Sequence, residues 1–128
     1  MTSATTTFDA RGLADVLDAS SQEQIDTLDF GVIGFDAAAT VQRYNAFESQ
    51  AAGLSPQRVI GEPLFTNVAP CLNNFLVAQR FEDAADEGCE LDDTIDYVLT
   101  LRMRPIKVKL RLLASANSGT RYVLVQRR

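Results

Sequence analysis

The sequence predicts a single α+β domain, with a central antiparallel sheet of about five to six strands, helices on one face of the sheet and an N-terminal helical cap. Two short segments rich in β-forming residues come early in the chain, and three more come after residue 90. Helical patterns fill the stretch between them, an order typical of antiparallel sheets flanked by helices. A length of 128 residues suits one domain with a sizeable core.

The N-terminal region is expected to form the helical cap over residues 1–29, ahead of a core over 30–128. One short helix covers about 12–17. A second starts near Ser21, because Gln24 follows at the spacing of a capping box.

Two strands and short helices open the core. Residues 30–35 are rich in β-forming side chains, and 40–44 alternate as a half-buried strand does. A helical turn is expected over 46–52, ended by Gly53. A further helix over 55–60 begins with serine as its N-cap and proline at its first position.

A longer helix is predicted over 73–87, where apolar residues recur at helical spacing and Gly88 ends the pattern. Its buried face is expected to include Phe75 and Leu76. The remaining segments predict three strands at about 90–101, 106–114 and 120–126, with a turn over 115–119.

Composition excludes several functions. A net charge of -5 argues against nucleic-acid binding through a basic surface. The absence of histidine rules out a Cys-His dyad, a Ser-His-Asp triad and ordinary histidine ligation of haem or zinc. No membrane-spanning run or secretory signal is recognisable, and a cytoplasmic protein is expected, monomeric or weakly dimeric.

Cys71 directly follows Pro70 and is the first candidate for chemistry. A free cysteine is most often a small buried hydrophobe. Here the helix predicted to follow places the thiol near a helix N-terminus, where the dipole stabilises a thiolate and favours acylation. Cys89 has no such setting, and we interpret it as structural.

Tyr44 and Glu48 are the second candidate. If the backbone turns helical after the strand, a separation of four residues puts both side chains on one face. Tyrosine donates one hydrogen bond, and a glutamic acid kept neutral by apolar surroundings donates a second. Together they are suited to hold one phenolate oxygen, with Glu48 as a store of one proton.

Three segments, in this order, carry a resemblance to the photoactive yellow protein (xanthopsin) family of the PAS domain superfamily. Residues 43–48 read Arg-Tyr-Asn-Ala-Phe-Glu, residues 67–71 read Asn-Val-Ala-Pro-Cys, and residues 103–109 read Met-Arg-Pro-Ile-Lys-Val-Lys. Each resembles a family motif, and the spacing between them is nearly the family's. Similarity extends thinly over most of the chain from Asp29 onward.

The resemblance implies a PAS fold and a blue-light photoreceptor. Its cofactor would be p-coumaric acid, attached as a 4-hydroxycinnamoyl thioester to Cys71. Tyr44 and Glu48 would contact the phenolate, Phe65 would belong to the pocket, and Met103 would speed return to the dark state. Light would drive trans-cis isomerisation, proton transfer from Glu48 and a conformational change read by a downstream signalling protein.

Three pocket positions depart from the family pattern. Ala52 stands where the family commonly has a threonine that supports the tyrosine. Leu54 replaces an arginine that covers the phenolate end, and Leu99 replaces an aromatic residue near the ring. Arg102 or Arg104 is available as a substitute cover, although a solvated strand-end charge is the more ordinary interpretation.

Two other classes of function stay open from the residues alone. One is a PAS sensory or interaction domain that binds another ligand or only a protein partner. The other is a thiol enzyme, which lacks a base for Cys71. Colour after supply of activated p-coumarate separates these classes.

Overall fold

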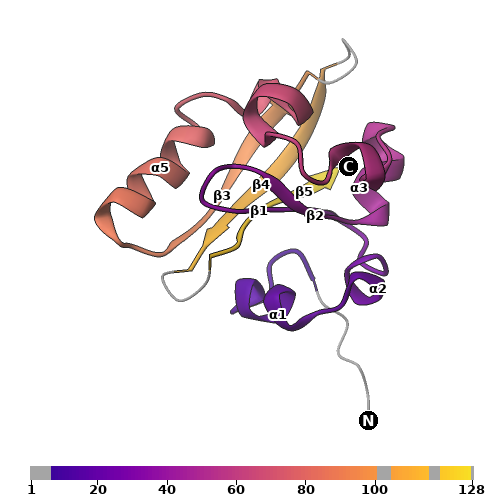
Figure 1. Cartoon of the computed structure of the whole chain (residues 1–128), viewed down its shortest axis with the longest axis horizontal. Coiled ribbons are helices and arrows are strands. Elements are labelled where there is room, and N and C mark those ends of the chain that lie inside the picture. Colours follow the sequence, from indigo (N-terminus) through magenta and orange to yellow (C-terminus); the bar gives the residue numbers. More distant parts are fainter. Residues whose placement is uncertain (1–6, 101–104, 116–118, 128) are drawn as a thin grey trace.

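The structure is a computed structural model that describes residues 7–100, 105–115 and 119–127. At its centre lies a five-stranded antiparallel sheet in the order β2-β1-β5-β4-β3 (Figure 1). This confirms the predicted α+β class and sheet. The strands are β1 (Gly31–Phe35), β2 (Val41–Tyr44), β3 (Leu91–Leu99), β4 (Ile106–Ala114) and β5 (Arg121–Arg127).

Helices cover both faces of the sheet (Figure 1). One face carries the N-terminal helices, which pack on a core that includes Leu17, Phe30 and Leu124. The other face carries the helical connection from β2 to β3, over a larger core that includes Ile33 and Val125. The helical elements are α1 (Leu13–Ala19), α2 (Gln22–Ile25), α3 (Ala46–Ala52), α4 (Pro56–Val59), the π-helix η1 (Leu64–Val68), the 3-10 helix η2 (Pro70–Leu72) and α5 (Ala78–Glu87).

The adjacent strands β1 and β5 determine which side chains meet on each face of the sheet. Strand β1 is buried along its whole length and pairs with β5, with Gly31 opposite Val125. Side chains alternate along β5: Val123 and Val125 point into the larger core, whereas Tyr122 and Leu124 point toward the N-terminal helices. Arg127 is therefore in phase with the larger core.

Side chains from the sheet bind the N-terminal segment, on either side of and within α1, through polar contacts. The guanidinium of Arg43 donates to the carbonyls of Leu17 and Ser20. Arg111 donates to the carbonyls of Phe8 and Ala10. These contacts add to the apolar core on that face and hold the cap at both ends.

Several element boundaries lie where the sequence predicts them, especially where a capping residue is present. The capping box between Ser21 and Gln24 is formed in both directions, as predicted. Helix α3 ends at Gly53, which adopts the left-handed conformation that glycine tolerates. The prediction of strand 106–114 is also confirmed.

The helix predicted over 73–87 was wrong at its start, because α5 begins at Ala78. The Asn74 side chain accepts hydrogen bonds from the backbone N–H groups of Leu76 and Val77, and this local bonding competes with a helix. Phe75 and Leu76 consequently leave the predicted buried face. Phe75 is 83% exposed.

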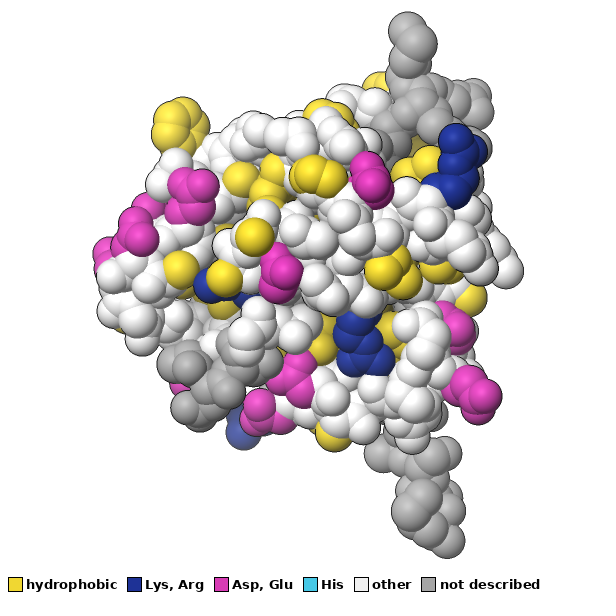
Figure 2. All heavy atoms as spheres, in the orientation of Figure 1, with side chains coloured by type: hydrophobic (Ala, Val, Ile, Leu, Met, Phe, Trp, Pro, Cys, Tyr) yellow, Lys and Arg dark blue, Asp and Glu magenta, His cyan; other side chains and the backbone are white. Residues whose placement is uncertain are grey.

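The sequence has a formal net charge of -5. On the face drawn in Figure 2, acidic side chains are scattered and basic ones do not gather into a patch. Within the described residues, no helix has the length and apolar character needed to cross a bilayer. No cluster of potential metal ligands occurs in that same part of the chain.

Candidate functional site

Tyr44 and Glu48 are brought together at the junction of β2 and α3. Tyr44 is the last residue of β2 and is 1% exposed. Asn45 caps the helix that follows, and its side chain accepts the N–H of Glu48 at 3.1 Å. Glu48 therefore lies in the first turn of α3, where it is 2% exposed.

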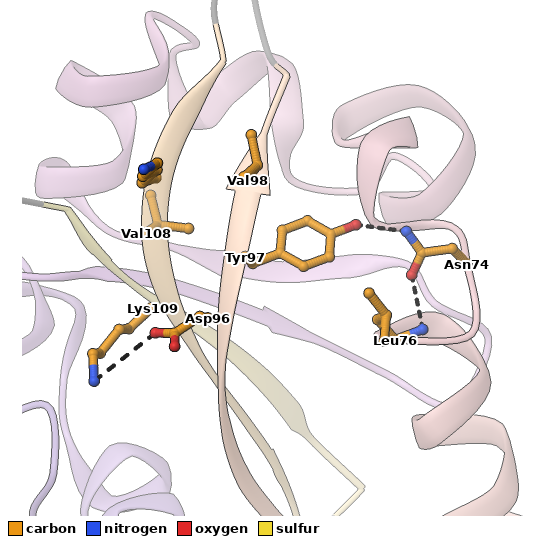
Figure 3. A pocket seen from close by; sticks show the side chains of 8 residues that line it. Asn74, Leu76, Asp96, Tyr97, Val98, Val108 and Lys109 are labelled. Carbon is orange, nitrogen blue, oxygen red and sulfur yellow. Dashed lines mark hydrogen bonds and ion pairs between the residues drawn. The ribbon is translucent and has the colours of Figure 1, made fainter.

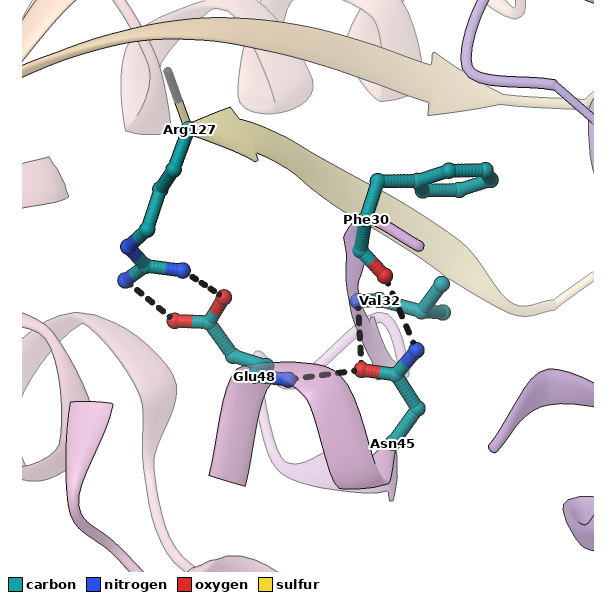
Figure 4. A network of polar contacts seen from close by, with 5 residues as sticks. All are labelled: Phe30, Val32, Asn45, Glu48 and Arg127. Atoms are coloured by element: carbon teal, nitrogen blue, oxygen red, sulfur yellow. Dashed lines mark hydrogen bonds and ion pairs between the residues drawn. The ribbon is translucent and has the colours of Figure 1, made fainter. Parts of the chain in front are cut away.

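Asn45 is a fully buried junction between three segments (Figure 4). Its Oδ1 also accepts from the N–H of Val32 in β1 at 2.9 Å. Its Nδ2 donates to the carbonyls of Ile25 and Phe30. All the hydrogen bonds of this buried amide link α3, β1 and the end of the N-terminal cap, so the position of Glu48 depends on each of them.

The carboxylate of Glu48 faces the guanidinium of Arg127, the last residue of β5 (Figure 4). Nη1 of Arg127 lies 2.6 Å from Oε1 of Glu48, and Nη2 lies 3.0 Å from Oε2. This is a bidentate, largely buried ion pair, since the Arg127 side chain is only 14% exposed. Arg127 is not among the site residues predicted from the sequence.

Burial and neighbouring charges shift the pKa values of Glu48 and Tyr44. Burial raises the pKa of Glu48 above its ordinary value, and this outweighs the hydrogen bonds and charge of Arg127, which act to lower it. Burial also raises the pKa of the Tyr44 phenol, and the neighbouring Glu48 carboxylate raises it further. Tyr44 consequently stays a hydrogen-bond donor at any physiological pH.

Gly31 leaves the space that Glu48 occupies. A Cβ atom added at Gly31 would lie 2.0 Å from Oε1 of Glu48 and 3.0 Å from its Cδ. Any side chain at position 31 would therefore displace the carboxylate from β1.

Tyr44 and Glu48 line a small pocket whose other walls are apolar. Five of the eight residues assigned to the site from the sequence border it. The lining comprises Ile33, Tyr44, Glu48, Ala52, Leu54, Val68, Ala69, Leu72, Leu99 and Val125.

Cys71 lies in the turn that forms one wall of this pocket. Its neighbours Ala69 and Leu72 are lining residues, and Cys71 itself is half-buried against the larger core. The predicted helix N-terminus at Cys71 was wrong, because the residue belongs to the three-residue helix η2 and α5 begins only at Ala78. A turn this short has little dipole to stabilise a thiolate.

Tyr97 fixes the backbone of the Cys71 turn. Its hydroxyl donates to the carbonyl oxygen of Cys71 and accepts from Nδ2 of Asn74. The ring comes from β3 and reaches across to the turn (Figure 3). Beside it runs a surface groove lined by Asn74, Leu76, Asp96, Tyr97, Val98, Lys107, Val108 and Lys109.

Phe65 and Cys89 lie apart from the pocket. Phe65 packs edge-to-face on Phe35, with ring centroids 5.6 Å apart, and borders a hollow next to α5. Cys89 is exposed just after α5. Met103, Arg102 and Arg104 fall outside the described residues.

The donor set of the pocket suits a phenol or phenolate. The Tyr44 hydroxyl and the Glu48 carboxyl are its ionisable groups, and apolar side chains make up the other walls. Its free volume is about 10 Å³, about the room of one water molecule. Admitting an aromatic acyl group would require the apolar walls to move apart, and the wall that carries Cys71 is made of short turns.

Comparison with known proteins gives a consistent result. No protein-family model matches the chain. The chain is 36% identical to photoactive yellow protein from Rhodothalassium salexigens, over 90% of this chain and 88% of that protein. It is 31% identical to photoactive yellow protein from Halochromatium salexigens, over 94% of this chain and 95% of that protein.

Solved structures agree with the sequence relatives. The photoactive yellow protein domain of the sensor histidine kinase Ppr from Rhodospirillum centenum superposes with a TM-score of 0.81 and 33% identity. That match covers 88% of this chain and 98% of the domain. The PAS domain of the quorum-sensing receptor RpfR from Cronobacter turicensis has a TM-score of 0.61 at 15% identity, over 80% and 97% of the two chains, which shows the fold alone.

Proposed function

Because the chain belongs to the photoactive yellow protein family, photoreceptors of the PAS fold and not enzymes, we propose that it senses blue light through a p-coumaroyl group held as a thioester on Cys71. The observation that carries this proposal is the pocket itself. A buried phenol and a buried carboxyl share it with apolar side chains, and the Cys71 turn forms one wall. When bound, the group supplies absorption of blue light and a trans-cis isomerisation.

The chain's own residues would bind and orient this group. Sγ of Cys71 carries the thioester, and Tyr97 holds the backbone of that turn through the Cys71 carbonyl. The Tyr44 hydroxyl and a protonated Glu48 donate hydrogen bonds to the phenolate oxygen. Apolar neighbours such as Leu54 and Leu99 exclude water, which strengthens these hydrogen bonds.

After illumination Glu48 gives up its proton from the carboxyl group. A carboxylate in an apolar pocket is costly, so the surroundings rearrange. Asn45 ties the same helix turn to Ile25 and Phe30 and so connects this change to the N-terminal cap. We assign residues 1–29 as the segment released and 30–128 as the core that keeps the pocket.

The output would be read by a signalling protein in the cytoplasm. PAS domains of sensor kinases are among the structural relatives, which supports a partner of that kind. Met103 would speed return to the dark state, and flash photolysis of Met103→Ala tests this role by a slower recovery.

The attachment is tested by supplying activated p-coumarate to the purified chain. Cys71→Ser should stay colourless, and Cys89→Ser should turn yellow and gain one coumaroyl group by intact mass. Cys89 is the matched control because it is the only other cysteine in the sequence. A Cys71→Ser protein with covalent pigment would overturn the assignment, and a wild-type protein that takes up no pigment would favour a PAS domain for another ligand.

A further inference from the structure

Arg127 is a partly buried cation that the family resemblance did not assign to the site. It follows Val125 on the core-facing side of β5, so strand alternation directs it to the pocket side of the sheet. Its two terminal nitrogens reach both oxygens of Glu48. In the described part of the chain, Arg127 is the charged group that acts on the pKa of Glu48, and Glu48 in turn acts on the pKa of the Tyr44 phenol.

The geometry of this contact is that of an ionised Glu48. A carboxylate accepts at both oxygens and matches the parallel N–H groups of a guanidinium. A protonated carboxyl would turn its own O–H toward one of those donors and lose that hydrogen bond. The two distances, 2.6 and 3.0 Å, are those of a carboxylate held at both ends.

A protonated Glu48 is nevertheless what the proposed function needs in the dark. The two requirements are compatible if they apply to different stages. We propose that Arg127 is the fixed cation of this site, which holds Glu48 as a carboxylate before the pigment is attached and again after Glu48 has given up its proton. The second half of this inference rests on the proposed function.

The charges balance at each stage. Before attachment, the negative charge is on Glu48 and the positive charge on Arg127. When a phenol enters, Glu48 takes up the phenol proton on one oxygen and gives up one hydrogen bond from Arg127, while the negative charge passes to the phenol oxygen. Return of that proton after illumination restores the carboxylate, and Arg127 keeps its charge throughout. No proton from solvent is needed.

This makes Arg127 a positioning residue that acts through Glu48. In its absence the carboxylate would lose both its countercharge and two donors inside a buried site. Glu48 would then stay protonated at neutral pH.

The test uses the chain before pigment is attached, with isotope-edited infrared spectroscopy of the carboxyl groups near neutral pH. In the wild type, Glu48 should show a carboxylate signal and no protonated band. Arg127→Met should gain a protonated band, and that band should be absent from the Arg127→Met/Glu48→Gln double variant. Arg127→Lys keeps the charge and should restore the carboxylate.

Arg121→Met is the matched control, since it removes an arginine at the other end of the same strand. It should leave Glu48 ionised. A protonated Glu48 in the wild type, or an ionised Glu48 in Arg127→Met, would overturn the proposal. Far-UV circular dichroism identifies a variant that fails to fold. If Arg127→Met does not fold, a protonated Glu48 in the wild type or in Arg127→Lys would still overturn the proposal.

A second arm separates this inference from the proposed function. If pigment attaches, loss of the Glu48 proton after a flash should be slower in Arg127→Met by roughly tenfold or more, because the product carboxylate has lost its partner. An unchanged rate would contradict the second half of the proposal. If no pigment attaches to any variant, the proposed function fails, while the spectra of the pigment-free chain still decide the first half.

Discussion

At the scale of single residues, the missing side chain of Gly31 is what lets Glu48 reach its position. Gly31→Ala would put a Cβ atom 2.0 Å from Oε1 of Glu48, so the carboxylate has to move or β1 has to shift. Overpacking of this kind costs about 1–3 kcal/mol. We expect denaturant unfolding to show a loss of that size. Gly119→Ala, where a Cβ meets open space, should change stability by far less, and equal losses would mean that Gly31 has no special role.

Ala52 lines the same pocket as Tyr44 and is the position to test the hydrogen-bond network. A hydroxyl in Ala52→Thr is expected to bond Tyr44 and hold it as a better donor to the phenolate, a stabilisation of about 1 kcal/mol. Since excitation moves charge away from the phenolate, stronger bonds there shift dark absorption to shorter wavelength. Glu48→Gln should shift it to longer wavelength, because an amide is a weaker donor. A shift to longer wavelength for Ala52→Thr would show that position 52 acts through packing.

Local spacing predicted some of these residues and not others. Tyr44 and Glu48 are four residues apart across a capped helix start, so their meeting follows from sequence. Arg127 meets Glu48 only because β5 lies beside β1 in the sheet. That neighbour relation is not visible in a linear pattern. The alternation that puts Arg127 in phase with Val123 and Val125 was the available signal, but the strand was predicted to end at residue 126.

At the scale of elements, the turn between β1 and β2 depends on Asp36. Its carboxylate accepts the N–H groups of Ala38 and Thr40 and an amide hydrogen of Gln42. These bonds, that of Thr40 foremost, lower the pKa of Asp36 below its ordinary value of 3.8. A lowered pKa stabilises the fold above the unfolded-state pKa, and this contribution is lost as pH falls through the folded-state value.

Asp36→Asn should therefore lower the free energy of unfolding at neutral pH and matter less below about pH 4. Urea unfolding over a pH series measures the gap between wild type and variant. Asp86→Asn makes the same change of charge on α5 at an exposed position and is the control. A gap that does not depend on pH would show that the charge of Asp36 contributes nothing to the turn.

Elements with capping signals were predictable, and those that depend on side-chain competition were not. The capping-box spacing of Ser21 and Gln24 is enough to predict the start of α2. The sequence after Cys71 has helical periodicity, yet Asn74 diverts the backbone through its own hydrogen bonds. The helix propensity of residues 73–77 is overridden by these hydrogen bonds of Asn74. The hydrogen bond from Asn74 to the Tyr97 hydroxyl, which joins distant parts of the chain, adds to this effect.

At the scale of the molecule, the sheet separates two cores, and the smaller one belongs to the N-terminal cap. Arg111 is the buried link on that side, bonded to Asp92 and to the carbonyls of Phe8 and Ala10. Arg111→Met should lower stability by about 1–3 kcal/mol, since bonds to a charged group are lost. Amide exchange should become faster over residues 8–28 and stay unchanged in α5.

Lys109→Met is the control for that variant. Lys109 lies on the same strand, and its Nζ is 4.0 Å from Asp96 in an exposed pair of small energetic value. Equal acceleration of exchange in α5 and in the cap after Arg111→Met would mean that the two cores open as one unit. That result would count against the division into a cap over 1–29 and a core over 30–128.

The position of β5 between β1 and β4 has a consequence for how the protein is made. Gly31 pairs with Val125, so the centre of the sheet closes a loop on the order of 90 residues. A nascent chain that still lacks β5 has neither a continuous sheet nor Arg127 to meet Glu48. Modification of Cys71 in its folded pocket therefore belongs after β5 has been synthesised, and a premature stop before Arg121 would remove the middle of the sheet instead of trimming its edge.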